Sequence, residues 1–306
     1  MQSIGHKHRA IKWTYDVAKE QWDRESVRVS MSRAPFEEGG MRLCYRAHEH
    51  ARNGDIFECV VKVFKPECEA ADHEYFDEAM TQMIADSYAQ DFNRKSKHKV
   101  AFLPVSVLQL QDGELSGSKL LALEPYMRGD YVKHNDNAGA VQTNEATPQA
   151  FSHWTYETSG GELVCCDIQG VGEFFTDPQI HSKDGEGFGS GNMGEEGVQR
   201  FLRTHACTSE CEALGLTPLR PGETDEQLAR RLQEGERMNR QPPKLAVAAP
   251  SRGGGGRRCS SDSSSSDDDV GHYIRRMRSG VGAKQITSQR YKTSLDDAIR
   301  MLRLNH

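Results

Sequence analysis

The chain has 306 residues, 36% of them hydrophobic and 27% charged, with a formal net charge of −6. This length can bury a full core and favours one two-lobed domain, or two small ones, with tails. The acidic balance provides no global basic field, so nucleic acid is not an expected direct partner. No apolar run approaches the roughly 20 residues of a membrane span, and the start MQSIGHKHRAIKW lacks the apolar stretch of a secretory signal. We therefore expect a soluble protein with no membrane partner.

The eight cysteines bear on the compartment. They are scattered singly or clustered with histidine, which does not look like a disulfide framework. This usage suits a reducing environment, and we expect a cytoplasmic location.

The first half of the chain is predicted to be rich in strands. Residues 72–94 place apolar side chains at helical intervals and predict one long helix. Four segments there alternate or run apolar with β-branched residues, as strands do: residues 26–31, 41–48, 57–65 and 119–125. A fifth predicted strand, residues 160–168, follows just beyond the midpoint.

The second half is predicted to consist of helix and loops. Residues 195–214 form a predicted helix that ends at Gly215, the residue type expected just past a helix end. A strand-rich half followed by a helix-and-loop half indicates an α+β fold with a cleft between the two parts.

The two ends of the chain are expected to lie outside the main fold. Residues 1–24 are interpreted as an N-terminal extension. Residues 219–280 are interpreted as a largely disordered linker, because the sequence beyond Pro242 is rich in Gly, Ser and Asp. Residues 281–306 return to helical spacing and predict an amphipathic helix that docks on the domain, binds a partner or belongs to a longer region.

Three charged side chains are candidates for chemistry on phosphate groups. Lys62 lies in the apolar run CVVKVF, which would hold its ammonium at a fixed place; an edge-strand lysine pointing to water is the alternative. Asp167 closes the run LVCC, and Asp177 follows in the turn-prone TDP, so both carboxylates are at the ends of elements. Either aspartate could instead satisfy local backbone donors.

A glycine-rich loop, DGEGFGSGNMG, follows these aspartates and contains GSGNMG, which matches GxGxxG. No clear strand with a dinucleotide-type helix and acidic partner accompanies it, so a dinucleotide site is a poor interpretation. A flexible backbone surface that another chain approaches fits better, and a plain surface loop is the alternative.

The sequence HxCxxxC, formed by His205, Cys207 and Cys211, predicts a zinc site, because imidazole and thiolates are the ligands zinc prefers. Cys207 and Cys211 are four residues apart and are expected on one helix face, whereas His205 requires a helix start or distortion. His153 is the best-placed fourth ligand. Four protein ligands would make the metal structural. The alternative is a helix with two buried cysteines and an exposed histidine.

Together these motifs resemble the α-kinases, a family of atypical serine/threonine protein kinases. The resemblance covers about residues 13–218 and rests on VVKVF, LALEPYMRGDYVKHN, TPQAFSHWTYE, DIQGVGEFFTDPQIH, FGSGNMG and HACTSEC. The conventional kinase strings HRD, DFG and APE do not occur in that order. Within the family, the elongation factor 2 kinases are the branch that the sequence resembles most.

The resemblance implies a two-lobed kinase fold over residues 25–218, with ATP between an N-lobe of about residues 25–123 and a C-lobe of about residues 124–218. It implies that Lys62 holds the ATP phosphates below a loop containing Gly39 and Gly40, and that the adenine meets Glu124 and Met127. It makes Asp167 the catalytic carboxylate. The remaining implied roles are Mg²⁺ binding by Gln169 and Asp177, substrate presentation by Gly189, Gly191 and Gly194, and structural zinc binding by His153, His205, Cys207 and Cys211.

The expected function is transfer of the ATP γ-phosphate to a protein serine or threonine, with elongation factor 2 as the first expected substrate. A filament protein, as for the myosin heavy chain kinases, is the rival substrate, and a zinc-stabilised pseudokinase is the non-enzymatic alternative. No calmodulin-binding motif is evident, so calmodulin remains an open partner. The family's phosphothreonine pocket is in doubt, because Asp86 and Glu145 replace its basic residues although Thr147 remains.

Overall fold

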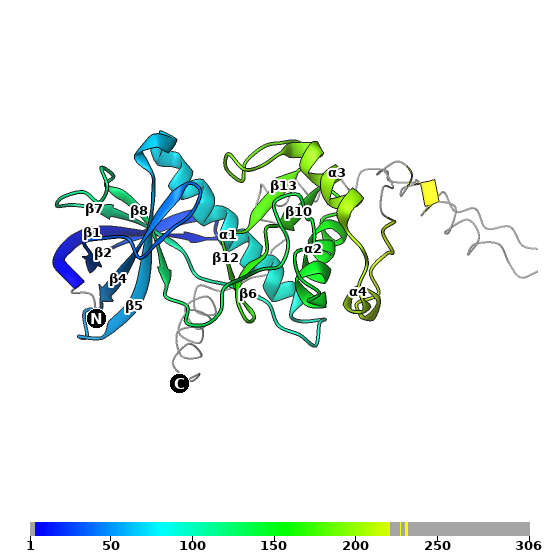
Figure 1. The fold of residues 1–306 in the computed structure, drawn as a ribbon, viewed down its shortest axis with the longest axis horizontal. Coiled ribbons are helices and arrows are strands. Elements are labelled where there is room, and N and C mark those ends of the chain that lie inside the picture. Colours follow the sequence, from blue (N-terminus) through cyan, green and yellow to red (C-terminus); the bar gives the residue numbers. More distant parts are fainter. Residues whose placement is uncertain (1–3, 221–226, 228–229, 232–306) are drawn as a thin grey trace, which may run out of the picture.

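The computed structural model describes residues 4–220 together with residues 227, 230 and 231 (Figure 1). The predicted C-terminal helix and nearly all of the predicted linker lie outside the described residues. Leu219, placed in the linker by the prediction, is instead 7% exposed and belongs to a hydrophobic cluster with Phe201 and Leu202. None of the described helices is long and apolar enough to cross a membrane.

The N-lobe is built on a seven-stranded sheet with the order β2-β1-β7-β8-β5-β4-β3, in which all pairings are antiparallel. A further pairing between β2 and β4 joins the sheet back on itself around a core that includes Val29, Val61 and Leu108. The strands are β1 (Ile4–Asp16), β2 (Gln21–Ser32), β3 (Glu37–Glu38), β4 (Arg42–His50), β5 (Ile56–Phe64), β7 (Ser106–Leu110) and β8 (Leu120–Pro125).

The expectation of an extension over residues 1–24 is wrong for its described part. β1 lies inside the sheet, between β2 and β7, and Ala10 of this strand is 1% exposed. Alternation along the sequence IGHKHRAIKW is masked by its many cations, which explains why the strand was not predicted.

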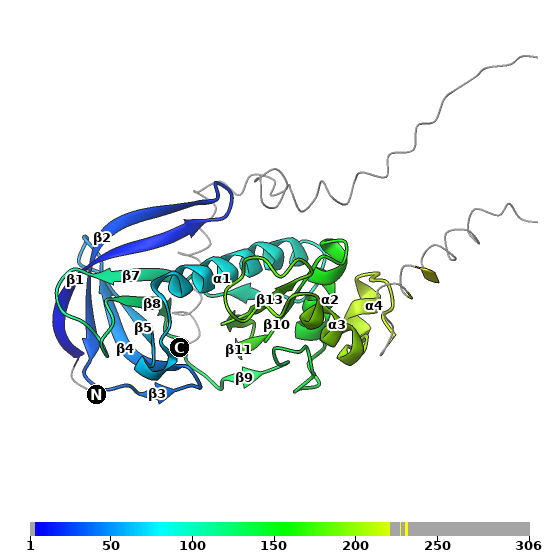
Figure 2. The same ribbon diagram turned by 90° about the horizontal axis from the view of Figure 1, so that it is seen from above.

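Helix α1 (Asp72–Phe92) connects the two lobes and follows the short 3₁₀ helix η1 (Pro66–Cys68). Figure 2 shows α1 running from the N-lobe sheet to the C-lobe. Its first half contributes Tyr75, Ala79 and Met83 to a cluster with N-lobe strands, and its second half contributes Tyr88 and Phe92 to the C-lobe core. One helix thereby fixes the lobes on a shared support.

Within residues 101–220, the C-lobe contains two small sheets and three helices. The four-stranded sheet has the order β6-β12-β11-β9, and β6 pairs with β12 in parallel. Residues 101–102 therefore belong to the C-lobe sheet, although the predicted boundary put them in the N-lobe. The elements are β6 (Ala101–Phe102), β9 (Val132–Lys133), α2 (Ala146–Thr158), β10 (Leu163–Cys166), β11 (Gln169–Val171), β12 (Phe174–Thr176), β13 (Gln179–Ser182), α3 (Gly194–Thr204) and α4 (Ser209–Ala213).

The predicted helix over residues 195–214 is two helices. α3 ends at Thr204, His205 takes an extended backbone conformation, and α4 begins at Ser209 after Thr208 caps it by accepting a hydrogen bond from the Cys211 N–H. Cys207 therefore lies in the connection and not on a helix face shared with Cys211, which corrects the expected arrangement.

Candidate active site between the lobes

A cleft with a volume of about 590 Å³ lies between the lobes. Both lobes line it, and it brings together side chains and glycines that are far apart in the sequence. The predicted site residues around the cleft are Gly39, Gly40, Lys62, Glu124, Met127, Asp167, Gln169, Asp177, Gly189 and Gly191. Gly194, also predicted for the substrate loop, begins α3 and does not line the cleft.

Lys62 lies on β5, an interior strand between β4 and β8, and is 7% exposed. Its Nζ lies 2.8 Å from Glu124 Oε2 and 2.7 Å from Asp177 Oδ2. Burial alone would lower the pKa of Lys62, but the two carboxylates raise it above its usual range. The lysine is therefore a charged group held inside the cleft, and the alternative of an edge-strand lysine in water is wrong.

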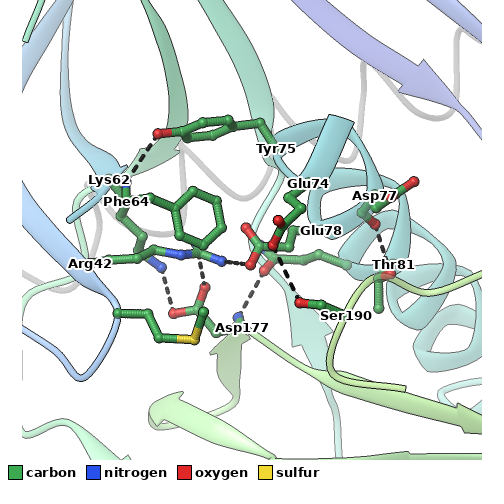
Figure 3. A network of polar contacts seen from close by, with 12 residues as sticks. Arg42, Lys62, Phe64, Glu74, Tyr75, Asp77, Glu78, Thr81, Asp177 and Ser190 are labelled. Carbon is green, nitrogen blue, oxygen red and sulfur yellow. Dashed lines mark hydrogen bonds and ion pairs between the residues drawn. The ribbon is translucent and has the colours of Figure 1, made fainter. Parts of the chain in front are cut away.

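Asp177 receives a second cation, Arg42, which the sequence interpretation missed. Arg42 lies 3.5 Å from Asp177 Oδ1 and also pairs with Glu78 of α1, as Figure 3 shows. Burial opposes ionisation of Asp177, but Lys62 and Arg42 together lower the pKa of its carboxyl. Burial raises the pKa of Glu78 to about 7, although Arg42 partly offsets the effect. The cleft thus contains a charge network shared by β4, β5 and α1.

Gln82 and Thr176 complete this network from the buried side. The Gln82 Oε1 accepts the Asp177 N–H at 2.8 Å, which fixes the backbone of Asp177 to α1. The Thr176 hydroxyl donates to Glu124 Oε2 at 2.8 Å. Both residues are 2–3% exposed, so the Glu124 carboxylate and the Asp177 backbone are held by hydrogen bonds from the protein interior.

Asp167 follows β10 and faces the cleft from the C-lobe. Lys133 lies 2.5 Å from its Oδ1, and the Gln169 side-chain amide donates to its Oδ2 at 3.0 Å. Burial raises the pKa of the Asp167 carboxyl, the Lys133 ammonium lowers it, and Asp177 raises it again. The net direction is upward, which makes Asp167 the better proton acceptor of the two aspartates.

Both aspartates have a left-handed backbone, with φ of 59° at Asp167 and 52° at Asp177. Such conformations cost energy for residues other than glycine and cluster at functional sites. Neighbouring hydrogen bonds hold the first one in place: the Asp167 N–H donates to the Asp136 carbonyl at 3.2 Å, and the Ile168 N–H donates to Asn135 Oδ1 at 2.8 Å. Asn135 is fully buried and was not identified from the sequence.

The glycine-rich loop lies beside the first turns of α1. Ser190 donates to Glu74 Oε2 at 3.3 Å, a contact drawn in Figure 3. Gly191 allows close approach, because an added Cβ would stand 1.9 Å from Gln179 Oε1. Asn192 closes the loop by accepting the N–H groups of Ser182 at 3.0 Å and Gly194 at 2.9 Å. These contacts fix the conformation of the loop at the edge of the cleft.

The four predicted zinc ligands, His153, His205, Cys207 and Cys211, converge in the C-lobe and are called the His/Cys cluster below. Their ligand atoms all lie within 4.8 Å of one another. Cys207 Sγ is 3.8 Å from His153 Nδ1, and Cys211 Sγ is 3.8 Å from His205 Nε2. Tetrahedral zinc with bonds of about 2.0–2.3 Å requires ligand separations of about 3.3–3.8 Å. The cluster therefore fits zinc, and its buried His205 excludes the alternative with an exposed histidine.

Burial lowers the pKa of His153 to about 4 and that of His205 to about 3. Neutral imidazoles are the form that binds a metal. The Leu219 N–H lies 3.3 Å from Cys207 Sγ and can stabilise a thiolate there. Three of the four donors are buried and Cys207 is half-buried, and a set of four protein donors suits a structural metal.

The Asp86 carboxylate, at a position where the resemblance implies a basic phosphate-binding residue, instead makes hydrogen bonds within the fold. Its Oδ1 accepts the Phe102 N–H at 3.1 Å and its Oδ2 accepts from Gln90 at 2.8 Å, so the carboxylate anchors β6 on α1. Burial raises the pKa of Asp86. Glu145 is exposed at the N-terminus of α2. Two acidic groups at these positions do not favour phosphate binding.

Comparison with known proteins identifies this arrangement. The alpha-kinase family model matches residues 37–211. Myosin heavy chain kinase B of Dictyostelium discoideum is 41% identical over 217 residues, which are 70% of this chain and 29% of that protein. Eukaryotic elongation factor 2 kinase of Mus musculus is 37% identical over 237 residues, which are 74% of this chain and 32% of that protein. The chain thus spans less than a third of either relative.

A crystal structure of the alpha-kinase domain of myosin-II heavy chain kinase A in complex with AMP-PNP matches with a TM-score of 0.67 and 33% identity. The match covers 71% of this chain and 99% of that domain. The ADP complex of the same domain matches with a TM-score of 0.66 and 34% identity. The chain therefore belongs to the alpha-kinase family of protein kinases.

Proposed function

We propose that the chain transfers the γ-phosphoryl group of ATP to a serine or threonine of a protein. The observation that carries this proposal is the convergence of Lys62, Asp167 and Asp177 in one cleft between the lobes. The complexes of a related domain with AMP-PNP and ADP support nucleotide binding in the same fold.

In this mechanism the chain positions charges and moves one proton. Lys62, held by Glu124 and Asp177, presents a buried cation to the phosphates. Asp167 accepts the proton of the substrate hydroxyl. The hydroxyl oxygen bonds to the γ-phosphorus as the bond between the γ-phosphorus and the β-phosphate oxygen breaks. ADP leaves with the electron pair of that bond.

Asp177 and Gln169 are the residues proposed to hold Mg²⁺. Their side chains line the cleft and offer carboxylate and amide oxygens, the ligands that Mg²⁺ prefers. The bound ion would neutralise charge on the phosphates. The Gln169 amide also donates to Asp167, so one residue links the proposed metal position to the proposed base.

A structural zinc in the His/Cys cluster is a further part of the proposal. Zinc would tie α2, which carries His153, to the connection and helix that carry the other three ligands.

The free thiols of the seven described cysteines suit the reducing cytoplasm that we propose as the location.

Elongation factor 2 is the proposed substrate, and phosphorylation of it would regulate translation elongation. The 37% identity with elongation factor 2 kinase supports it. A myosin heavy chain is the second candidate, which the 41% identity with myosin heavy chain kinase B favours. Calmodulin stays an open partner.

The test is transfer from γ-labelled ATP onto purified elongation factor 2 and onto a helical myosin-tail fragment, each at several concentrations. Asp167→Ala measures the background, and Asp23→Ala, an exposed aspartate of β2, is the matched control. A higher kcat/KM for elongation factor 2 supports the first substrate, and the reverse order supports the second. A folded protein that transfers to neither, and does not phosphorylate itself, favours the pseudokinase.

A further inference from the structure

We propose that Arg46 is a positioning residue of the nucleotide site, an inference that rests on the proposed phosphoryl transfer. The guanidinium carbon of Arg46 lies 3.5 Å from the ring centroid of Tyr126 and 4.4 Å from that of Phe36. The two rings are 6.2 Å apart and meet edge to face at 83°. Arg46 therefore contacts both rings as a cation, an arrangement called the Arg46 stack below.

The Arg46 stack joins two segments that border the cleft. Phe36 precedes the loop that contains Gly39 and Gly40, and its N–H donates to the Cys44 carbonyl at 2.9 Å. Tyr126 begins the connector, residues 126–131, that follows β8. Arg46 pairs with Val60 of β5, and Val60 pairs with Glu124 of β8, so the side chain spans from β4 across the sheet to the connector.

Phe36, Tyr126, Val60 and Met127 line the cleft, whereas Arg46 does not. Arg46 thus acts through the rings and not by touching a nucleotide. An adenine ring needs a flat apolar slot of fixed width, and here the distance between the glycine loop and the connector sets that width. Loss of the cation would let the two segments separate, which weakens nucleotide binding more than the chemical step.

The connector has a second attachment that does not involve Phe36. The Tyr126 N–H donates to the Glu58 carbonyl at 3.1 Å, and Arg128 pairs with the Glu58 carboxylate at 2.5 Å. The bond from Arg128, together with the nearby Arg46 cation, lowers the pKa of Glu58. These contacts are expected to hold the connector on β5 when Arg46 is replaced, so the variants should fold, and the segment that carries Phe36 is the one that moves away.

The experiment compares wild type, Arg46→Ala and Arg46→Lys. Calorimetry with ADP gives the dissociation constant, and labelled-ATP transfer gives KM and kcat. Cation–π contacts contribute roughly 0.5–2 kcal/mol, so the Kd for ADP and the KM for ATP are expected to rise about two- to thirtyfold in Arg46→Ala, with kcat within about twofold. Lysine should restore only part of the affinity, since its ammonium does not stack as a plane.

Arg24→Ala is the matched control, because the Arg24 guanidinium lies 5.7 Å from the ring of Trp13, outside the cleft. A double-mutant cycle of Arg46→Ala with Phe36→Leu tests whether Arg46 acts through Phe36. If it does, the losses of ADP affinity in the two single variants should be less than additive in the double variant. Full additivity, an unchanged ADP affinity in Arg46→Ala, or a loss confined to kcat would overturn the proposal. Wild type that binds ADP but transfers no phosphate would contradict the proposed function alone, and the ADP affinities would still decide the role of Arg46.

Discussion

The cleft holds Asp177 and its two cations in the charged form, whereas the His/Cys cluster holds its histidines in the neutral form. In the cleft, Lys62 and Arg42 keep Asp177 ionised by direct contact. In the cluster, burial lowers the pKa of both histidines and leaves them neutral. We propose that the cleft binds and releases a charged ligand, whereas the cluster holds one cation permanently. Catalysis and structural support are assigned to different regions of the molecule.

The largest expected effect comes from the His/Cys cluster. Cys211→Ser, or removal of metal by a strong chelator, is expected to unfold much of the C-lobe, because structural zinc contributes on the order of 10 kcal/mol in small zinc domains. Thermal unfolding and metal content by mass spectrometry measure this. Cys68→Ser, at a half-buried cysteine outside the cluster, is the control. Unchanged melting in Cys211→Ser would contradict a structural zinc.

Lys62→Met is the corresponding change in the cleft. It leaves Glu124 and Asp177 without their shared cation, and breaking a buried ion pair costs about 3–5 kcal/mol. We expect a lower melting temperature and loss of ADP binding in calorimetry, with zinc content unchanged. Lys19→Met is the control, because Lys19 is exposed and its ion pair with Asp16 lies outside the cleft. ADP binding at wild-type affinity in Lys62→Met would show that Lys62 does not contribute to nucleotide binding.

Gly191→Ala tests whether the glycine-rich loop presents the substrate. The new methyl group would collide with the amide end of the Gln179 side chain, so either that side chain or the loop must shift. We expect KM for the protein substrate to rise about tenfold while the affinity for ADP stays within about twofold. Gly187→Ala probes the same loop where an added Cβ meets nothing within 4 Å, although its φ of 71° adds some strain. Equal KM values for wild type and Gly191→Ala would exclude the loop from substrate binding.

Lys133→Gln gives the smallest effect, a shift of the acid limb of the pH–rate profile. Lys133 lowers the pKa of Asp167, so replacing Lys133 raises that pKa. Because the base must be ionised, the decline of the rate on the acid side of the profile then begins at a higher pH. The ion pair is partly exposed, and such pairs contribute about 0.2–1 kcal/mol, which corresponds to a shift of at most ~0.7 pH unit. A shift toward lower pH would refute Asp167 as the base.

Local motifs indicated Asp167, Asp177 and three residues of the His/Cys cluster, because DIQGVG, TDPQIH and HACTSEC each keep their residues within a few positions. The resemblance to the α-kinases supplied the roles of Gln169 and Glu124. The motifs could not predict Arg42, Glu78 or Gln82, whose roles depend on β4 and α1 meeting Asp177 across long sequence separations. Helix α2 was missed because residues 148–156 are all buried, so no polar face marks its period.

Single-turnover measurement of γ-phosphate transfer by folded, zinc-loaded wild type and Asp167→Asn tests whether Asp167 is the catalytic base. We expect a loss of about 10³-fold or more in the transfer rate of Asp167→Asn, with unchanged ADP affinity, melting temperature and zinc content. Transfer by Asp167→Asn at the wild-type rate, or no transfer by wild type with ATP and Mg²⁺ bound, would contradict the account.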